Sequence, residues 1–131
     1  MIGLDTNVLV RYIMQDDPRQ SPLATRTLES LSTESPGFVP LAAIVELAWV
    51  LTSAYELSRS QLIEALEALL QTRELSVEHG ATVWKGVRLM RSTGADFADC
   101  LIACTAGTAG CSRTMTFDRD AARHGVMTLV D

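Results

Sequence analysis

The residues best able to do chemistry in this sequence are acids that stand next to apolar segments. Asp5 follows the apolar run Met1–Leu4, and Asp118 follows a second expected strand, Thr114–Phe117. In parallel α/β sheets, ligands bind at the carboxyl ends of the strands, so both acids occupy the usual position of a functional residue. Each acid could equally be a turn residue or the N-cap of the helix that follows it.

A third acid, Glu46, lies inside the apolar segment Ala42–Val50. A glutamate in such a run is seldom buried without a partner, so we favour a functional role for it. The alternative is a solvent-facing position on a helix with one narrow polar strip.

Asp96 and Asp99 are three residues apart and therefore share one face at the start of an expected helix. Asp99 precedes the apolar segment Cys100–Ala103, and we interpret it as functional, although it could also respond to the helix dipole. Asp96 is well placed to be the N-cap, and its role stays open between a cap and a residue that supports a ligand acid.

Three or four carboxylates gathered in one pocket repel each other unless some are protonated or a cation joins them. A hard divalent cation satisfies such a set with oxygen ligands alone, and the lack of paired His or Cys favours Mg²⁺ or Mn²⁺ over zinc. Such ions activate water and stabilise charge on a phosphoryl group, so we expect phosphodiester hydrolysis. A metal site also accounts for the net charge of −5, which otherwise argues against a nucleic-acid substrate.

The elements that must position these acids alternate between short apolar strands and amphipathic helices, which is typical of a parallel sheet covered on both faces. Ser58 and Gln61 form a capping box signature, and Gly94 is expected to end a helix. The expected strands are Met1–Leu4, Phe38–Pro40, Leu75–Val77, Thr114–Phe117 and Met127–Val130. The expected helices are Val8–Ile13 after a Thr6-Asn7 cap, Ser21–Leu31, Leu41–Ala54 (buried), Ser58–Gln71, His79–Ser92, Asp96–Thr105 and Arg119–Arg123.

Length and composition restrict the class of protein. We expect a single domain over residues 1–131, and the 47% hydrophobic content excludes a disordered chain. No apolar run reaches the roughly 18 residues that a membrane helix needs, and the start lacks a secretion signal, so we expect a cytoplasmic protein. Three cysteines, an odd number, indicate packed, reduced thiols instead of a disulfide framework.

Four segments in order make the sequence similar to a known family. They are Ile2-Gly3-Leu4-Asp5-Thr6-Asn7-Val8, Val45-Glu46-Leu47, Asp96-Phe97-Ala98-Asp99-Cys100-Leu101-Ile102-Ala103 and Thr116-Phe117-Asp118. Together they resemble the PIN-domain family, especially the VapC-type toxin ribonucleases of VapBC toxin–antitoxin pairs.

The resemblance implies a three-layer α/β/α PIN-like fold with a short, mainly parallel central sheet flanked by helices. It implies an Mg²⁺- or Mn²⁺-dependent endoribonuclease, the toxin of a type II toxin–antitoxin system. The expected partners are an RNA substrate, a small antitoxin that inserts a C-terminal segment into the site, and a second copy in a homodimer or a toxin–antitoxin hetero-oligomer.

The resemblance also carries specific residues over to this chain. Asp5, Asp99 and Asp118 would hold one or two metal ions, with Glu46 acting directly or through water. Thr116 would orient water or a ligand carboxylate, or is an ordinary strand residue. The supporting residues further include Asn7, expected to hydrogen-bond Asp5 or its neighbours, and Asp96.

The main alternative function is a catalytically silent PIN-fold interaction protein that binds a basic peptide in its acidic pocket. Metal-dependent nuclease activity distinguishes the two functions. Trp49 and Trp84 are expected in the core or an interface, with base stacking as the less favoured role. The candidates for holding the RNA backbone, each of which could also be an ordinary solvated residue, are Lys85, Arg88 and Arg91, or Arg11 and Arg119.

Overall fold

The computed structural model describes residues 1–131. The chain divides into two compact units, an N-terminal unit, Met1–Glu78, and a C-terminal unit, His79–Asp131, and each is described by itself. That the whole chain forms a single domain stays a prediction.

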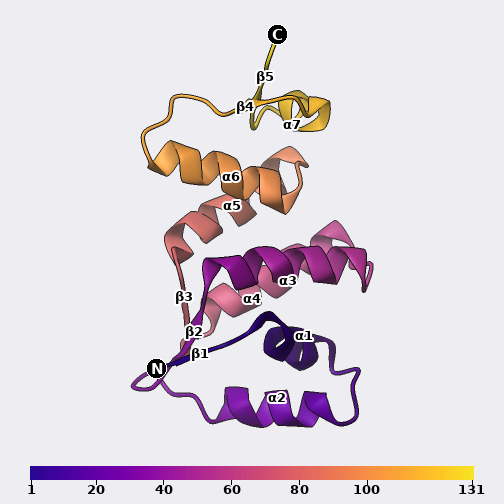
Figure 1. Cartoon of the computed structure of the whole chain (residues 1–131), viewed down its shortest axis with the longest axis vertical. Coiled ribbons are helices and arrows are strands. Elements are labelled where there is room, and N and C mark those ends of the chain that lie inside the picture. Colours follow the sequence, from indigo (N-terminus) through magenta and orange to yellow (C-terminus); the bar gives the residue numbers. More distant parts are fainter. The chain divides into compact units, whose positions relative to one another are not determined.

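The N-terminal unit contains a short sheet and four helices (Figure 1). In chain order these are β1 (Ile2–Gly3), α1 (Thr6–Met14), α2 (Gln20–Glu29), β2 (Gly37–Val39), α3 (Leu41–Ser53), α4 (Arg59–Gln71) and β3 (Leu75–Val77). The C-terminal unit contains α5 (Gly80–Thr93), α6 (Phe97–Thr108), β4 (Met115–Thr116), α7 (Arg119–Arg123) and β5 (Thr128–Leu129).

The sheet of the N-terminal unit has the order β1-β2-β3 with both pairs parallel. The Leu4 amide donates to the Phe38 carbonyl at 2.9 Å, so the β1–β2 ladder continues one residue past β1 and holds the backbone immediately before Asp5. At the start of the central strand, Gly37 allows close packing: a Cβ there would lie 2.8 Å from Leu4 Cδ1 and 2.9 Å from Leu31 Cδ1.

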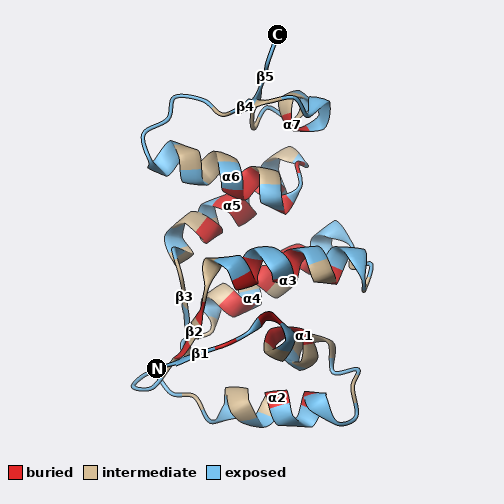
Figure 2. Ribbon diagram, viewed as in Figure 1, coloured by how far each residue is buried: buried red, intermediate tan, exposed pale blue.

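The core of the N-terminal unit is built from α1, α3 and α4 (Figure 2). Its largest fully buried side chains are Leu9, Ile44, Leu47, Leu51 and Leu66, and α1 packs against both α2 and α3. Burying side chains of this size is worth roughly 1.5–3 kcal/mol each, which is enough to hold short helices that would be marginal alone.

The C-terminal unit is built on an α5–α6 hairpin. Val83, Val87 and Met90 from α5 are buried, as are Phe97 and Leu101 from α6. Gly94 ends α5 in the left-handed conformation, with φ of 83°, as the sequence predicts. The strands β4 and β5 pair in parallel.

The predicted order of helices and strands is confirmed, and the helix-rich chain with short, all-parallel strand pairs agrees with the predicted three-layer α/β/α class. Three of the expected strands are longer than those observed, since β1, β4 and β5 have two residues each, whereas β3 has the expected bounds. No helix combines the length and the apolar composition needed to cross a membrane.

Three local expectations are wrong. The helix α1 begins at Thr6, and its N-cap is Asp5, not Thr6-Asn7. The helix α3 is not buried on all sides, because Trp49 is 68% exposed and therefore lies outside the core. The three cysteines are free, but Cys111 is exposed instead of packed.

Candidate active site

Asp5 combines two positions that matter for a site, the end of a strand and the start of a helix. It is the exposed N-cap of α1, and its Oδ1 accepts a hydrogen bond from the Thr6 amide at 2.8 Å. The next residue, Thr6, is buried, which fixes the backbone beside the acid. The N-cap interpretation left open by the sequence is therefore correct, and an exposed carboxylate is still compatible with a ligand role.

Glu46 lies on the exposed face of α3, so burial does not require a partner for it. Together with Leu41, Ala42, Val45 and Trp49 it lines an open hollow of about 610 Å³. The predicted solvent-facing alternative describes its position, but the neighbours of Glu46 on this face are apolar instead of polar.

Asp96 and Asp99 meet at the start of α6. Asp96 is the N-cap, and its Oδ1 accepts from the Asp99 amide at 2.8 Å. Asp99 is half-buried at the third helical position. The capping role considered for Asp96 is therefore present, and Asp96 holds the backbone of Asp99 in place.

Asp118 is held in the same way at the start of α7. Its Oδ1 accepts from the Asp120 amide at 2.8 Å and from the Ala121 amide at 3.4 Å. The Asp118 amide in turn donates to Thr116 Oγ1 at 2.9 Å. Thr116 is thus more than a strand residue, because its hydroxyl fixes the backbone of the acid two positions later.

The acids of the C-terminal unit interact electrostatically. Burial first, and then the negative charges of Asp96 and Asp118, raise the pKa of Asp99 above its ordinary value. Asp118 is nineteen residues from Asp99 in the sequence, so this coupling shows that the fold brings the two carboxylates near each other. A set of carboxylates that disfavour each other's charge is the electrostatic setting that a cation relieves.

The four acids of the predicted site come from both units, Asp5 and Glu46 from the N-terminal one and Asp99 and Asp118 from the C-terminal one. No group of three or more His, Cys, Asp or Glu side chains in the structure is arranged to hold a metal ion.

The other predicted supporting residue, Asn7, is exposed. It lines a hollow of about 250 Å³ between α1 and α2, together with Arg11 and Leu23. Its role toward Asp5 stays a prediction.

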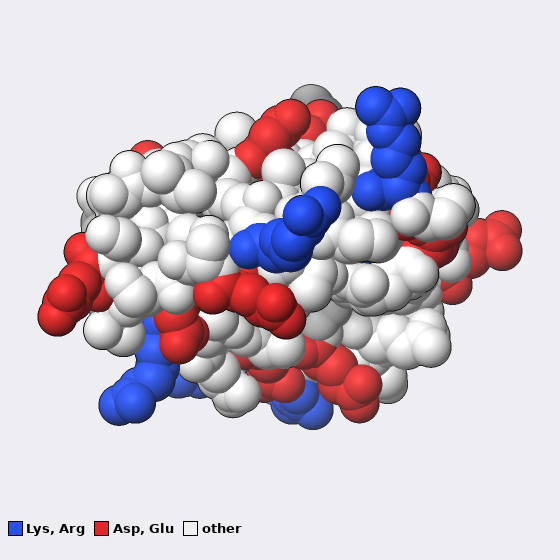
Figure 3. Space-filling view, turned by 90° about the horizontal axis from the view of Figure 1, so that it is seen from below, with Lys and Arg blue, Asp and Glu red and all other residues white.

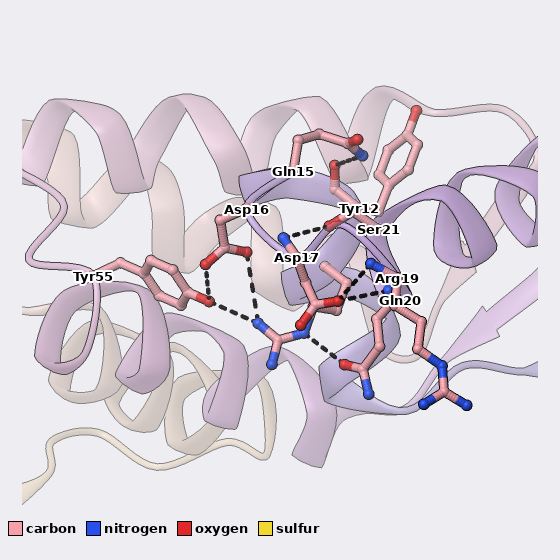
Figure 4. Close-up of polar contacts among 9 residues, drawn as sticks. Tyr12, Gln15, Asp16, Asp17, Arg19, Gln20, Ser21 and Tyr55 are labelled. Carbon is pink, nitrogen blue, oxygen red and sulfur yellow. Dashed lines mark hydrogen bonds and ion pairs between the residues drawn. The ribbon is translucent and has the colours of Figure 1, made fainter.

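A polar network that the sequence did not indicate joins the ends of α1 and α3 (Figure 4). Arg11 Nη1 donates to Tyr55 Oη at 3.0 Å and lies 3.6 Å from Asp16 Oδ1, while Tyr55 Oη donates to Asp16 Oδ2 at 2.9 Å. Arg11 Nε also donates to Gln20 Oε1 at 2.7 Å, which includes α2. Tyr55 lies 44 residues from Arg11, so no local pattern pairs them, yet the network fixes the two helices that carry Asp5 and Glu46.

Charge is divided unequally between the units. The N-terminal unit has five Lys or Arg residues against eleven Asp or Glu, and the C-terminal unit has six against five. On the face shown in Figure 3, acidic side chains are scattered among basic ones. The net charge of −5 therefore arises in the N-terminal unit, and the C-terminal unit is slightly basic.

Comparison with known families identifies the class of protein. The PIN domain family matches residues 2–126, a span that includes all four candidate acids. The chain belongs to the PIN-domain family.

Comparison with curated proteins gives no match. Among solved structures, the chain is similar to the Mycobacterium tuberculosis toxin VapC20, whose description is a sarcin–ricin loop cleaving toxin. The identity is 17%, the match covers 95% of each chain, and the TM-score is 0.47.

Proposed function

We propose that this chain is an Mg²⁺- or Mn²⁺-dependent endoribonuclease that hydrolyses RNA phosphodiester bonds. The observation that supports the proposal is the PIN-domain match over residues 2–126, because it spans Asp5, Glu46, Asp99 and Asp118. The protein is the toxin of a type II toxin–antitoxin pair, acts in the cytoplasm, and forms a homodimer or a hetero-oligomer with a small antitoxin.

The donor chemistry fits a hard divalent cation. All four candidate ligands are carboxylates, and the pKa of Asp99 is raised by burial and by its acidic neighbours, so a nearby cation would favour its charged form. Oxygen ligands without His or Cys suit Mg²⁺ or Mn²⁺. Asp5, Asp99 and Asp118 would hold the ion, with Glu46 directly or through water.

A bound ion of this kind would supply Lewis-acid stabilisation of the phosphate and a more acidic water. The residues of the chain position the carboxylates that would bind this ion. The amide of Thr6 orients the carboxylate of Asp5, and the amides of Asp120 and Ala121 orient that of Asp118. Asp96 and Thr116 fix the backbones of Asp99 and Asp118, so these acids are held before any ligand arrives.

Cleavage of a labelled RNA by the purified protein in Mg²⁺, Mn²⁺ or EDTA tests the proposal. Replacing Asp5→Asn, Asp99→Asn or Asp118→Asn should lower the cleavage rate at least about 100-fold, since each removes an anionic ligand. The matched control is Asp120→Asn, which removes an exposed acid beside Asp118 whose carboxylate pairs with Arg123.

Cleavage that persists in EDTA, or full activity in Asp5→Asn, would contradict the metal-dependent mechanism. The silent interaction protein gives a different result, namely no cleavage by the unmodified chain in either metal. Asn is as good an N-cap as Asp, so the thermal stability of Asp5→Asn and Asp118→Asn should stay close to that of the parent and separate lost chemistry from lost folding.

A further inference from the structure

The helix α5 has a charge pattern that no other helix of this chain shares. Residues 79–95 contain Lys85, Arg88 and Arg91 and no Asp or Glu, in a chain with sixteen acids. Lys85 and Arg88 are exposed, and Trp84, which directly precedes Lys85, is half-buried. Arg91 already takes part in another interaction.

The Arg88 guanidinium lies over the Trp84 ring, 5.5 Å from the ring centroid. This cation–π contact occupies one face of the guanidinium and leaves the N–H donors at its edge free to bind phosphate. The outer face of the guanidinium is a flat surface on which a base can stack, since proteins stack unpaired RNA bases on aromatic rings and on arginine planes.

Two other arginines of the chain are already paired with acids. Arg11 contacts Asp16 and donates to Tyr55 and Gln20, and Arg123 pairs with Asp120 at 2.8 Å. Arg11 was one of the candidates for holding RNA, but its guanidinium already binds other side chains of the chain. The guanidinium of Arg88 contacts only the ring of Trp84.

We infer that Trp84, Lys85 and Arg88 form a binding surface for single-stranded RNA, on which Lys85 and the edge of Arg88 hold phosphates and a base stacks on the Arg88–Trp84 pair. The inference rests on the proposed ribonuclease function and adds the surface that holds its substrate. An acidic peptide would satisfy the charges alone, but the stacked aromatic–guanidinium pair favours a nucleobase.

RNA binding in EDTA tests this surface without cleavage. The probe is a fluorescein-labelled oligouridylate, and the readouts are its affinity and the slope of log K against log salt. Lys85→Gln should lower the affinity and reduce the slope by about 0.7, the value for one phosphate contact on a single strand. Arg26→Gln, which removes an exposed charge from the N-terminal unit, is the matched control and should change neither.

The stacking part has its own variants. Arg88→Lys keeps the charge and loses the plane, so the affinity should fall about 5-fold or more while the salt slope stays within error. Trp84→Leu removes the support beneath the guanidinium and should behave in the same way. Circular dichroism and thermal melting check that each variant is folded. If Trp84→Leu does not fold, the variants at the exposed positions 85 and 88 still test the surface.

Tryptophan emission tests the location directly. The chain has two tryptophans, so Trp49→Phe leaves Trp84 as the only indole. Saturation with the oligouridylate should change the emission of Trp84, and this change should disappear in the Arg88→Gln background.

The outcomes separate this inference from the proposed function. Unchanged Trp84 emission, or affinities unaltered by all three substitutions in a chain that still cleaves RNA, would overturn the RNA surface and leave the nuclease proposal intact. RNA binding through α5 without any metal-dependent cleavage would support the RNA surface and overturn the nuclease proposal. Binding of an oligoglutamate peptide at this face in preference to RNA would also overturn the inference.

Discussion

Three of the acids singled out by their position are N-caps. Asp5, Asp96 and Asp118 each use one carboxylate oxygen to bind backbone amides at the start of a helix. The functional and the capping interpretation therefore do not exclude each other, because a second oxygen remains in each case. A cap also fixes the direction of the carboxylate, which is what a ligand acid needs before a metal arrives.

Another acid whose carboxylate binds backbone amides, Asp17, gives a test by pH. The amides of Gln20 and Arg19 donate to its carboxylate and lower the pKa of Asp17 in the folded chain. Because the folded pKa is depressed, this contribution to stability is complete above the unfolded pKa and is lost as the pH falls through the folded value, below about pH 4.

Urea unfolding at pH 7 and pH 3 measures the effect of this carboxylate. We expect Asp17→Asn to be less stable than the parent at pH 7, with the difference shrinking at pH 3. Glu34→Gln, an exposed acid in the loop before β2, is the control. A difference that stayed constant with pH would argue against ionisation of Asp17 as its cause.

The hydroxyl of Tyr55 is a second group whose contribution to the free energy of unfolding can be measured. It accepts from Arg11 and donates to Asp16, so Tyr55→Phe removes two hydrogen bonds and leaves the Arg11–Asp16 ion pair. We expect a loss of about 0.5–1.5 kcal/mol per bond removed in urea unfolding. Tyr12→Phe, at an exposed tyrosine of α1, is the control and should change the stability little. Equal losses at both positions would show that the hydrogen bonds of Tyr55 are not the cause.

At the scale of elements, the start of α4 could be predicted in detail. Ser58 Oγ accepts from the Gln61 amide at 3.2 Å, and Gln61 Oε1 accepts from the Ser58 amide at 2.8 Å. The spacing of these two residues is a local signal, and local signals are what a sequence shows most directly. The end of α1 lacks the Gly or Asn that usually fills this position, because Gln15 adopts the left-handed conformation there.

The capping box predicts the effect of one substitution. Ser58→Ala leaves amides at the start of α4 without their partner and should destabilise the chain by about 1 kcal/mol. Thermal or urea unfolding measures this loss against Ser60→Ala, which changes an exposed serine of the same turn that is not the cap. A loss of equal size in both variants would mean that helix propensity, not the cap, is responsible.

The exposure of α3 could not be predicted from its composition. Its thirteen residues are almost all apolar, which indicated a buried helix, yet Val45, Glu46 and Trp49 form an exposed face. An apolar helix shows which residues avoid water on average but not which side faces the rest of the chain. The same uncertainty made Glu46 look like a buried charge.

At the scale of the whole molecule, the sequence predicts the order of the elements and acids along the chain. It does not predict which of these acids lie close together in space. The strand ends that precede Asp5 and Asp118 and the shared face of Asp96 and Asp99 follow from local spacing. The coupling of Asp99 to Asp118 depends on how α6 and α7 pack, which no local pattern encodes. The uneven charge of the two units was present in the sequence but acquired meaning only when their boundary was known.

The capping role of the acids has a consequence for how this chain can change over generations. Mutations that replace Asp5, Asp96 or Asp118 with apolar residues would be removed by selection for folding alone, whether or not the descendant still cuts RNA. A lineage that loses activity would drift at these positions toward Asn or Ser, which cap equally well. Glu46, which makes no cap, is free of that constraint, so its loss would be the earlier sign of a relative that has abandoned catalysis.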